Sequence, residues 1–428
     1  MNKVILINPP SNCIDDDHLE PQLGLLYIAS VLRENNISTQ IYDMTGKNTL
    51  EQIKKGIEDI PDGNIYGFTT YCTNYSYVKQ CINHIRSKIN NAFIVLGGPN
   101  PTALPEFTLT DSKCDCVVLG EGEDALLHIV HSFWNGSTLP SIIAGTGRID
   151  IDTYPMPAWD LIDINSYTRT LEGEKVVSIV SSRGCKYNCI HCNSVVMGGG
   201  NRARYRSAKN ITEEISYLKT KGFQKFRFND DNFTGNPNLT ELLYEIKELD
   251  ISFRIFARIE DLNEKSCQLL AESGCRHISI GLETLNPNNL KILGKHTQAG
   301  LEEKHLCNAK KYGMTLRIYF MIGLPFDTDK TIKKYFKKAS KLPFDEFSIY
   351  PLIPYPGTRI AKQPEKFGYD VIDKDFTHYV QVGKNKTTTF ALRHRNFTEQ
   401  DVKHWYDYIV ELLLSSKKLL QCQSKIAV

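Results

Sequence analysis

The first third of the chain alternates short apolar runs with longer segments whose apolar residues recur at helical spacing. Short apolar runs bounded by Gly, Pro, Asn or Asp are typical of buried strands, and apolar residues three or four positions apart predict helices. The expected strands are residues 4–8, 38–42, 65–69, 93–96 and 116–119, and the expected helices are 23–34, 77–89 and 123–133. This alternation predicts an α/β fold with a doubly wound, Rossmann-like domain over residues 1–135.

The pattern changes twice further along the chain. Residues 136–174 lose their periodicity and are rich in Gly, Pro, Ser and Asp, which is typical of a linker. A second series then begins, with strands at 176–181, 225–229, 252–257, 277–281, 315–322 and 346–352 and helices at 211–221, 239–249, 264–273, 301–312 and 330–342. This series predicts a partial (βα)6 barrel over residues 175–368, with its reactive face at the carboxyl ends of the strands. An amphipathic helix at 398–418 predicts a small helical region over residues 369–428.

Composition limits the possible partners. The 51 basic and 49 acidic side chains nearly cancel, so no global field favours binding to nucleic acid or to an anionic membrane. No apolar run approaches the roughly 18 residues of a membrane span, and the first ten residues do not resemble a signal peptide. Twelve cysteines without such a peptide indicate reduced thiols. We therefore expect a cytoplasmic protein without a membrane span or a nucleic-acid partner.

Three of the cysteines form a cluster directly after the first strand of the second series. Cys185, Cys189 and Cys192 lie in one loop, and three thiolates can hold a 4Fe-4S cubane while leaving one iron open to a substrate or cofactor. A structural zinc site is the main alternative and would need His191 as its fourth ligand. His191 is wedged between two of the ligands, which favours the iron–sulfur interpretation. Cysteines without any metal are the remaining alternative.

The motif Cys-x-x-x-Cys-x-x-Cys after a first barrel strand resembles the radical S-adenosylmethionine (SAM) superfamily. The resemblance implies that Cys185, Cys189 and Cys192 bind a 4Fe-4S cluster whose open iron is chelated by SAM. It also implies that one electron, from a reductant such as flavodoxin or ferredoxin, splits SAM to give a 5′-deoxyadenosyl radical. In such enzymes the cofactor performs the difficult chemistry, and the protein orients it and excludes water.

Further segments at predicted strand ends resemble segments of this superfamily. Residues 229–234 resemble its Asp-Asp-x-Phe segment, 280–284 its Gly-x-Glu-Ser segment, and 322–328 its Gly-Leu-Pro-Gly-Glu-Thr segment, with Phe326 and Asp327 replacing Gly and Glu. An arginine at the third strand end can pair with the SAM carboxylate. The residues expected at SAM or the substrate are Tyr187, Asp230, Asp231, Arg258, Glu283, Thr284 and Gly323. Turn capping, a surface ion pair, a helix-start acid and loop packing are the alternative roles for the side chains among them.

The first domain resembles the cobalamin (B12)-binding domain that is fused to one branch of these enzymes. The resemblance is carried by residues 21–29, 96–102 and 119–123, whose glycines let the backbone approach a flat macrocycle. The residues expected at this cofactor are Thr70, Tyr71, Gly97, Gly98, Gly120 and Glu121. Asp43 is not followed by the His that ligates cobalt in classical cobalamin domains, and this branch often lacks that His. A relic domain that binds substrate without cobalamin is the alternative.

Together these resemblances imply a cobalamin-dependent methyltransferase that acts on an unactivated carbon of a small-molecule or natural-product substrate. They assign no further catalytic residue. A rearrangement, cyclisation or ring contraction on the same two domains is the second interpretation. A tRNA methylthiotransferase is disfavoured because the first domain lacks a second three-cysteine cluster and the chain ends without a basic RNA-binding domain. A non-enzymatic nucleotide-binding scaffold is the alternative from another class.

Overall fold

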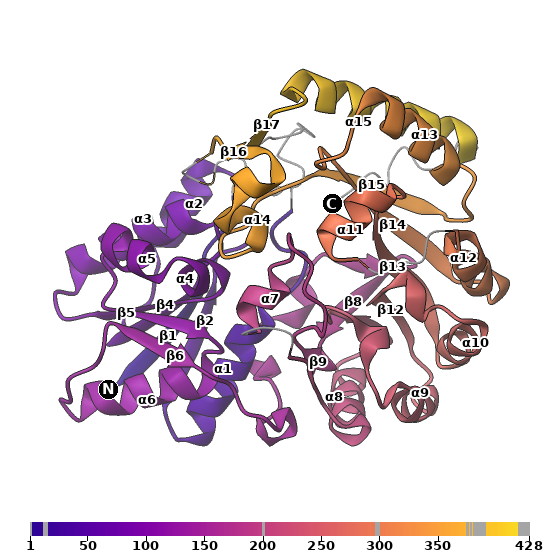
Figure 1. Cartoon of the computed structure of the whole chain (residues 1–428). Coiled ribbons are helices and arrows are strands. Elements are labelled where there is room, and N and C mark those ends of the chain that lie inside the picture. Colours follow the sequence, from indigo (N-terminus) through magenta and orange to yellow (C-terminus); the bar gives the residue numbers. More distant parts are fainter. Residues whose placement is uncertain are drawn as a thin grey trace. The chain divides into compact units, whose positions relative to one another are not determined.

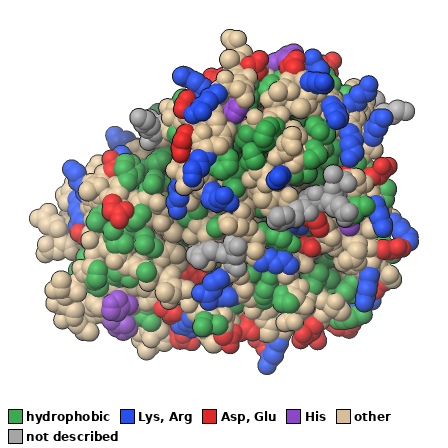
Figure 2. Space-filling model, in the orientation of Figure 1, with side chains coloured by type: hydrophobic (Ala, Val, Ile, Leu, Met, Phe, Trp, Pro, Cys, Tyr) green, Lys and Arg blue, Asp and Glu red, His purple; other side chains and the backbone are tan. Residues whose placement is uncertain are grey.

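The computed structural model describes residues 2–11, 16–198, 202–295, 300–373, 376, 379 and 391–417. Its contacts divide the chain into two compact units (Figure 1). Unit 1 consists of Met1–Arg169 and Asn193–Arg204, and unit 2 consists of Thr170–Cys192 and Tyr205–Val428. Within the described residues, no helix combines the length and the apolar character needed to cross a membrane. Acidic and basic side chains are interspersed over the face shown in Figure 2, in keeping with their balanced numbers.

Unit 1 is built on a six-stranded parallel sheet of order β2-β1-β3-β4-β5-β6. The strands are β1 (Lys3–Asn8), β2 (Ser38–Asp43), β3 (Ile65–Thr69), β4 (Phe93–Gly97), β5 (Cys116–Gly120) and β6 (Ile142–Gly145). The helices are α1 (Leu23–Glu34), α2 (Leu50–Glu58), α3 (Tyr75–Lys88), α4 (Pro99–Ala103), α5 (Pro105–Ser112) and α6 (Glu123–Trp134). The strand order reverses between β1 and β3, where α/β sheets of this kind bind their ligands. The predicted doubly wound domain is confirmed.

Strand β1 shows why this sheet carries helices on both faces. Its apolar residues run without interruption, which is typical of a strand buried on both sides. Ile5 and Ile7 pack into one hydrophobic cluster with residues of α3, and Val4 and Leu6 pack into a second cluster with residues of α1 and α6. Each face of the sheet therefore has its own core.

Among the elements of unit 1 that were not predicted are α2, α4, α5 and β6. Strand β6 lies inside the segment 136–174, which the sequence predicted as a linker, and it pairs with β5. Its residues are only partly buried or exposed, so they carry no apolar run. Trp159, in the same segment, is 1% exposed. This segment therefore adds a strand and a buried aromatic side chain to unit 1.

Unit 2 is built on a seven-stranded sheet of order β15-β14-β13-β12-β11-β8-β7, in which β7 alone is antiparallel to its neighbour. The strands are β7 (Thr170–Leu171), β8 (Glu174–Ile179), β11 (Lys225–Phe228), β12 (Ser252–Ala257), β13 (Cys275–Glu283), β14 (Thr315–Ile322) and β15 (Glu346–Pro351). The helices α8 (Ala208–Thr220), α9 (Leu239–Lys247), α10 (Glu264–Glu272), α12 (Glu302–Lys311) and α13 (Asp329–Ala339) cover its outer face (Figure 1). The sheet does not close on itself, so the predicted partial barrel is confirmed.

The last described part of the chain holds a pair of short strands followed by a helix. Strands β16 (Tyr369–Val371) and β17 (Leu392–His394) pair antiparallel, and α15 (Glu399–Lys417) packs against α13 and β14. The helix agrees with the predicted amphipathic segment, whose last residue, 418, lies outside the described residues. This strand pair was not predicted, because its two strands are short and distant in sequence.

Candidate functional site

The three clustered cysteines follow strand β9 (Ser182–Arg183) in a loop that is fixed by one buried side chain. Their thiols are partly exposed and form no disulfide. Ile190, between the second and third cysteine, is 2% exposed and packs in a hydrophobic cluster with Leu293 and Ile360. Its backbone N–H donates to the Leu293 carbonyl at 3.2 Å, and its carbonyl accepts from the Ile360 N–H at 3.1 Å. Ile190 is thus anchored, while the three cysteines around it stay partly exposed.

Three thiols in one loop suit a cubane with one open iron. Across the described parts of the chain, no three His, Cys, Asp or Glu side chains converge on a point suited to one metal ion. A structural zinc needs such convergence, whereas each thiolate of a cubane binds a different iron. Burial lowers the pKa of His191, the fourth ligand that zinc would need, and the neighbouring Glu283 opposes that shift. The assignment of Cys185, Cys189 and Cys192 to a 4Fe-4S cluster therefore rests on the number of thiols in the loop and stays a prediction.

Asp230 lies under the beginning of the cysteine loop. Its carboxylate accepts hydrogen bonds from the Ser181 N–H at 3.1 Å, the Ser181 hydroxyl at 2.9 Å and the Ser182 hydroxyl. The carboxyl is buried, and burial raises its pKa to about 6 despite these bonds. Asp230 therefore fixes the connection from β8 to the loop. The adjacent Asp231 is exposed at the same strand end.

Arg258, at the end of β12, lies beside a cysteine of the loop. Its guanidinium is 3.8 Å from the centre of the Tyr187 ring, and its Nη1 is 4.0 Å from Cys189 Sγ. Its Nη2 donates to Glu260 Oε1 at 3.0 Å. Burial opposes the charge, but Glu260 and Cys189 together raise the pKa of Arg258. The site thus holds a permanent cation that can pair with an anionic ligand at the loop.

Glu283 ends β13 in a strained backbone conformation. Its φ of +64° is in the left-handed region, and the pairing with β14 shifts register between Gly281 and Glu283. The Glu283 carboxylate lies 2.9 Å from Lys295 Nζ. Burial alone would raise its pKa, but the charge of Lys295 and the proximity of His191 lower it. The next residue, Thr284, is buried, and its hydroxyl accepts the Asn286 N–H at 3.1 Å to close the turn.

The turn after β14 is fixed by a buried carboxyl. Gly323 has φ +73°, and its carbonyl accepts the Tyr369 hydroxyl at 2.5 Å. The Asp327 carboxyl accepts from the Leu324 N–H at 2.9 Å and from Asn289 Nδ2 at 2.7 Å. Asp327 stands where the superfamily segment has Glu. The shorter side chain still bonds the backbone of the turn.

Asp327 should make stability depend on pH. Burial raises its pKa to about 7, whereas the unfolded carboxyl ionises near 4. The stability contributed by the neutral carboxyl is therefore complete below about pH 4 and is lost as pH rises to about 7. Asp327→Asn stays neutral, so its unfolding free energy relative to that of the parent should be higher at pH 8 than at pH 5, by about 2 kcal/mol. Its melting temperature relative to the parent should therefore also be higher at pH 8. Thermal unfolding at both pH values measures this difference; Asp370→Asn, at an exposed position, is the control. A pH-independent difference for Asp327→Asn contradicts the assignment.

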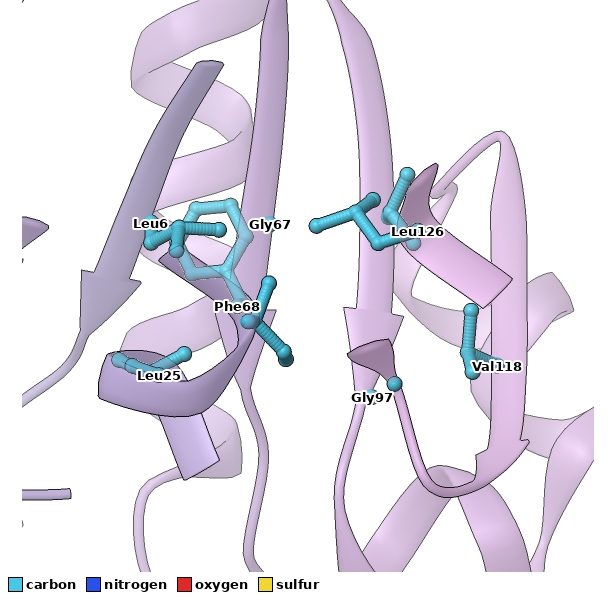
Figure 3. Close-up of a pocket in the computed structure, with 10 residues that line it drawn as sticks. Leu6, Leu25, Gly67, Phe68, Gly97, Val118 and Leu126 are labelled. Carbon is cyan, nitrogen blue, oxygen red and sulfur yellow. The ribbon is translucent and has the colours of Figure 1, made fainter. Parts of the chain in front are cut away.

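Unit 1 has an apolar pocket at the end of its sheet, between the strands and helices α1 and α6 (Figure 3). Its cavity volume is about 30 Å³, and it is partly open to solvent. It is lined by Leu6, Leu25, Ile28, Gly67, Phe68, Val95, Gly97, Val118, Gly122 and Leu126. A Cβ added at Gly97 would meet no atom within 4 Å, so the absent side chain is what keeps this part of the pocket open. An apolar recess of this kind suits a planar ring rather than a charged group.

Close to this pocket, two buried polar side chains have no hydrogen-bond partner among the described residues. Gly98 has φ +106°, and a Cβ there would lie 2.9 Å from the Thr70 carbonyl oxygen, so the close approach of these loops requires glycine. The Thr70 hydroxyl and both polar atoms of the Asn100 amide form no hydrogen bond within the described residues. Such buried groups are normally satisfied by a ligand or water. They fit the amide-bearing periphery of cobalamin, and the sequence did not assign a role to Asn100.

The other residues expected at cobalamin have partners within unit 1. The Tyr71 hydroxyl donates to Gln22 Oε1 at 3.0 Å, and Gly120 has φ +76° at the end of β5. Glu121 forms an ion pair with Arg204. This pair attaches the segment Asn193–Arg204 to the loop between β5 and α6, so the carboxylate of Glu121 has a structural role.

The structure places an imidazole beside Asp43 and Thr45, where the sequence shows no His. His18 Nδ1 is 2.6 Å from Thr45 Oγ1, His18 Nε2 is 3.0 Å from Ser166 Oγ, and the ring stacks on Tyr167 at 4.4 Å. Both ring nitrogens are thus engaged by hydroxyl groups. His18 lies 27 residues before Thr45, so no local motif could have indicated this contact.

Comparisons with known families agree with this geometry. The chain matches the B12 binding domain over residues 15–130 and the Radical SAM superfamily over residues 179–339. An uncharacterised methyltransferase of Pyrococcus horikoshii is 31% identical over 84% of this chain and 82% of its own length. The bacteriochlorophyllide d C-12(1)-methyltransferase of Chlorobaculum tepidum is 24% identical over 83% of this chain and 77% of its own length.

Among solved structures, the radical SAM methyltransferase TsrM of Kitasatospora setae, with cobalamin and a 4Fe-4S cluster bound, has the same fold. Its TM-score is 0.72 at 16% identity, and the match covers 97% of this chain and 89% of that one. The chain belongs to the radical SAM superfamily, in the branch with an N-terminal B12-binding domain. It is an enzyme of the cobalamin-dependent methyltransferase type, and its cofactors are a 4Fe-4S cluster, SAM and cobalamin.

Proposed function

We propose that this enzyme cleaves SAM reductively at its cluster and methylates an unactivated carbon of a small-molecule substrate. The observation that carries the proposal is the cysteine loop anchored by Ile190, with Arg258 and Glu283 at neighbouring strand ends, in a chain whose first unit holds an open apolar pocket. When bound, the cluster and SAM supply a carbon-centred radical, and cobalamin supplies the methyl group. The methyltransferase relatives favour this reaction over rearrangement without methyl transfer.

The protein's own residues supply position and charge. Cys185, Cys189 and Cys192 hold the cluster, and Asp230 fixes the strand that leads into their loop. Arg258 offers its guanidinium to the SAM carboxylate, and the anionic Glu283 offers an acceptor to the SAM amino group or ribose hydroxyls. In unit 1, the residues around the apolar pocket would hold cobalamin, and the side chains of Thr70 and Asn100 would hydrogen-bond the amide groups of this cofactor.

The test is the cofactor and product content of the full-length protein after anaerobic reconstitution. We expect about four irons and one cobalt per chain. With a strong reductant and SAM, we expect 5′-deoxyadenosine, and with a substrate also S-adenosylhomocysteine. Stoichiometric zinc without SAM cleavage contradicts the proposal. SAM cleavage without cobalt binding supports a radical SAM enzyme but contradicts methyl transfer through cobalamin.

A further inference from the structure

Lys295 connects the cysteine loop of unit 2 with the end of strand β13. It follows helix α11 (Pro287–Leu293), and its backbone N–H donates to the Leu290 carbonyl at 2.9 Å. The carbonyl of Leu293, the last residue of this helix, accepts the Ile190 N–H of the cysteine loop at 3.2 Å. The backbone that carries Lys295 is therefore fixed next to this loop.

The Lys295 side chain reaches back to the strand end where Glu283 lies. Its ammonium donates to Glu283 Oε1 at 2.9 Å and to the Gly281 carbonyl oxygen. Only 8% of the Lys295 side chain and 13% of the Glu283 side chain are exposed. Lysine side chains are rarely buried to this extent unless they are paired. The ammonium thus bridges a carboxylate and a backbone carbonyl of the same strand end.

The Glu283 carboxylate depends on this partner for its orientation. The bond with Lys295 occupies Oε1, and within the described residues Oε2 accepts no hydrogen bond. A glutamate side chain has several rotamers, and an ion pair on one oxygen selects among them. Removing one partner of a buried ion pair also leaves the other charge uncompensated. Lys295 therefore fixes the direction in which Oε2 can accept a further hydrogen bond.

We infer that Lys295 is a positioning residue for SAM: its ammonium fixes the Glu283 carboxylate so that Oε2 accepts hydrogen bonds from the SAM amino group or ribose hydroxyls. The inference rests on the proposed function, which gives Glu283 this acceptor role, and adds a residue outside the superfamily segment at 280–284. Lys295 acts through Glu283 and does not itself contact SAM. The sequence did not assign a role to Lys295, because the pair joins residues 12 positions apart across a helix.

The SAM affinity of the reconstituted full-length enzyme tests this role. Lys295→Met removes the ammonium but keeps a long side chain, and we expect SAM to bind about tenfold more weakly. The iron content should stay at about four per chain. Lys295→Arg keeps the charge and should bind SAM more tightly than Lys295→Met does. Lys291→Met, at an exposed position of α11, is the matched control and should leave SAM affinity unchanged. Anaerobic titration calorimetry gives the dissociation constants.

A double substitution shows whether Lys295 acts through Glu283. Glu283→Gln keeps the shape of the side chain, removes its charge and should weaken SAM binding by itself. If Lys295 only positions this carboxylate, adding Lys295→Met to Glu283→Gln should cause no further loss, because residues that act as a unit are not additive. Additive losses would mean that Lys295 interacts with SAM independently, and this result overturns the inference. Unchanged SAM affinity in Lys295→Met overturns it as well.

Iron content and circular dichroism identify a Lys295→Met variant that fails to fold. Lys295→Gln, which can still donate to the Gly281 carbonyl, then takes its place, and the same weakening of SAM binding is expected. Failure of both variants to fold would assign Lys295 to the stability of unit 2 and contradict the positioning role. A parent enzyme that cleaves SAM, with unchanged affinity in the variants, rejects only the role of Lys295. A parent enzyme that does not cleave SAM rejects the proposed function.

Discussion

Replacing any one of Cys185, Cys189 and Cys192 by alanine should reduce iron from about four per chain to near zero and abolish formation of 5′-deoxyadenosine. The loop offers three thiols, so no spare ligand can replace a lost one. Its position does not depend on the metal alone, because Ile190 is buried and both of its backbone groups are hydrogen-bonded. We therefore expect the alanine variants to fold and to lose the cluster specifically.

Iron and sulfide analysis, the visible absorption of the cluster and chromatography of the SAM products measure this effect. Cys307→Ala is the matched control, since that cysteine is exposed on α12 of the same unit. It should keep full iron content and cleavage activity. A cysteine-loop variant that retains cluster absorption and SAM cleavage would remove that cysteine from the set of ligands.

A second large effect is expected from filling the pocket of unit 1. Gly97→Phe places a ring in space where no atom lies within 4 Å of the added Cβ, and the backbone there does not need glycine. The ring should occupy the apolar recess shown in Figure 3 and compete with cobalamin. We expect cobalamin affinity to fall at least a hundredfold while the cluster and 5′-deoxyadenosine formation remain.

Cobalt content and the absorption spectrum after incubation with hydroxocobalamin measure the loss. Leu50→Phe adds the same ring at an 80% exposed position of unit 1 and should bind cobalamin as the parent does. Retention of stoichiometric cobalamin by Gly97→Phe would show that the cofactor lies elsewhere. Loss of SAM cleavage together with cobalamin would show that the substitution damages more than the pocket.

The sequence predicts those parts of the fold that depend on local pattern. Most strands and helices of both units follow from apolar periodicity, because a parallel sheet covered by helices buries its strands on both faces. The cysteine loop follows from spacing, since its three thiols lie within one short segment. Strand β6 was not predicted, because its residues are partly buried or exposed at a sheet edge and form no recognisable apolar run.

The roles of individual side chains depend on contacts between distant segments, which periodicity does not encode. Asp230 was expected at SAM, and the structure shows its carboxylate bonded to Ser181 and Ser182, nearly fifty residues earlier. Glu121 was expected at cobalamin, and the structure shows it paired with Arg204. The contact between His18 and Thr45 exists only in the folded chain, because the two residues are 27 positions apart in sequence. Whether Asp230, Glu121 and the other predicted side chains also contact a cofactor stays a prediction.

The chain passes between the two units three times, at residues 169–170, 192–193 and 204–205. One of these crossings is the peptide bond that follows Cys192, so a predicted cluster ligand and the first residue of a unit 1 segment are covalent neighbours. Helix α7 (Ser194–Met197) in that segment contacts α4, and Arg204 at its end is paired with Glu121. Neither unit is therefore a contiguous module. Separating the units at residue 169 would leave Asn193–Arg204, a segment of unit 1, on the fragment that carries unit 2.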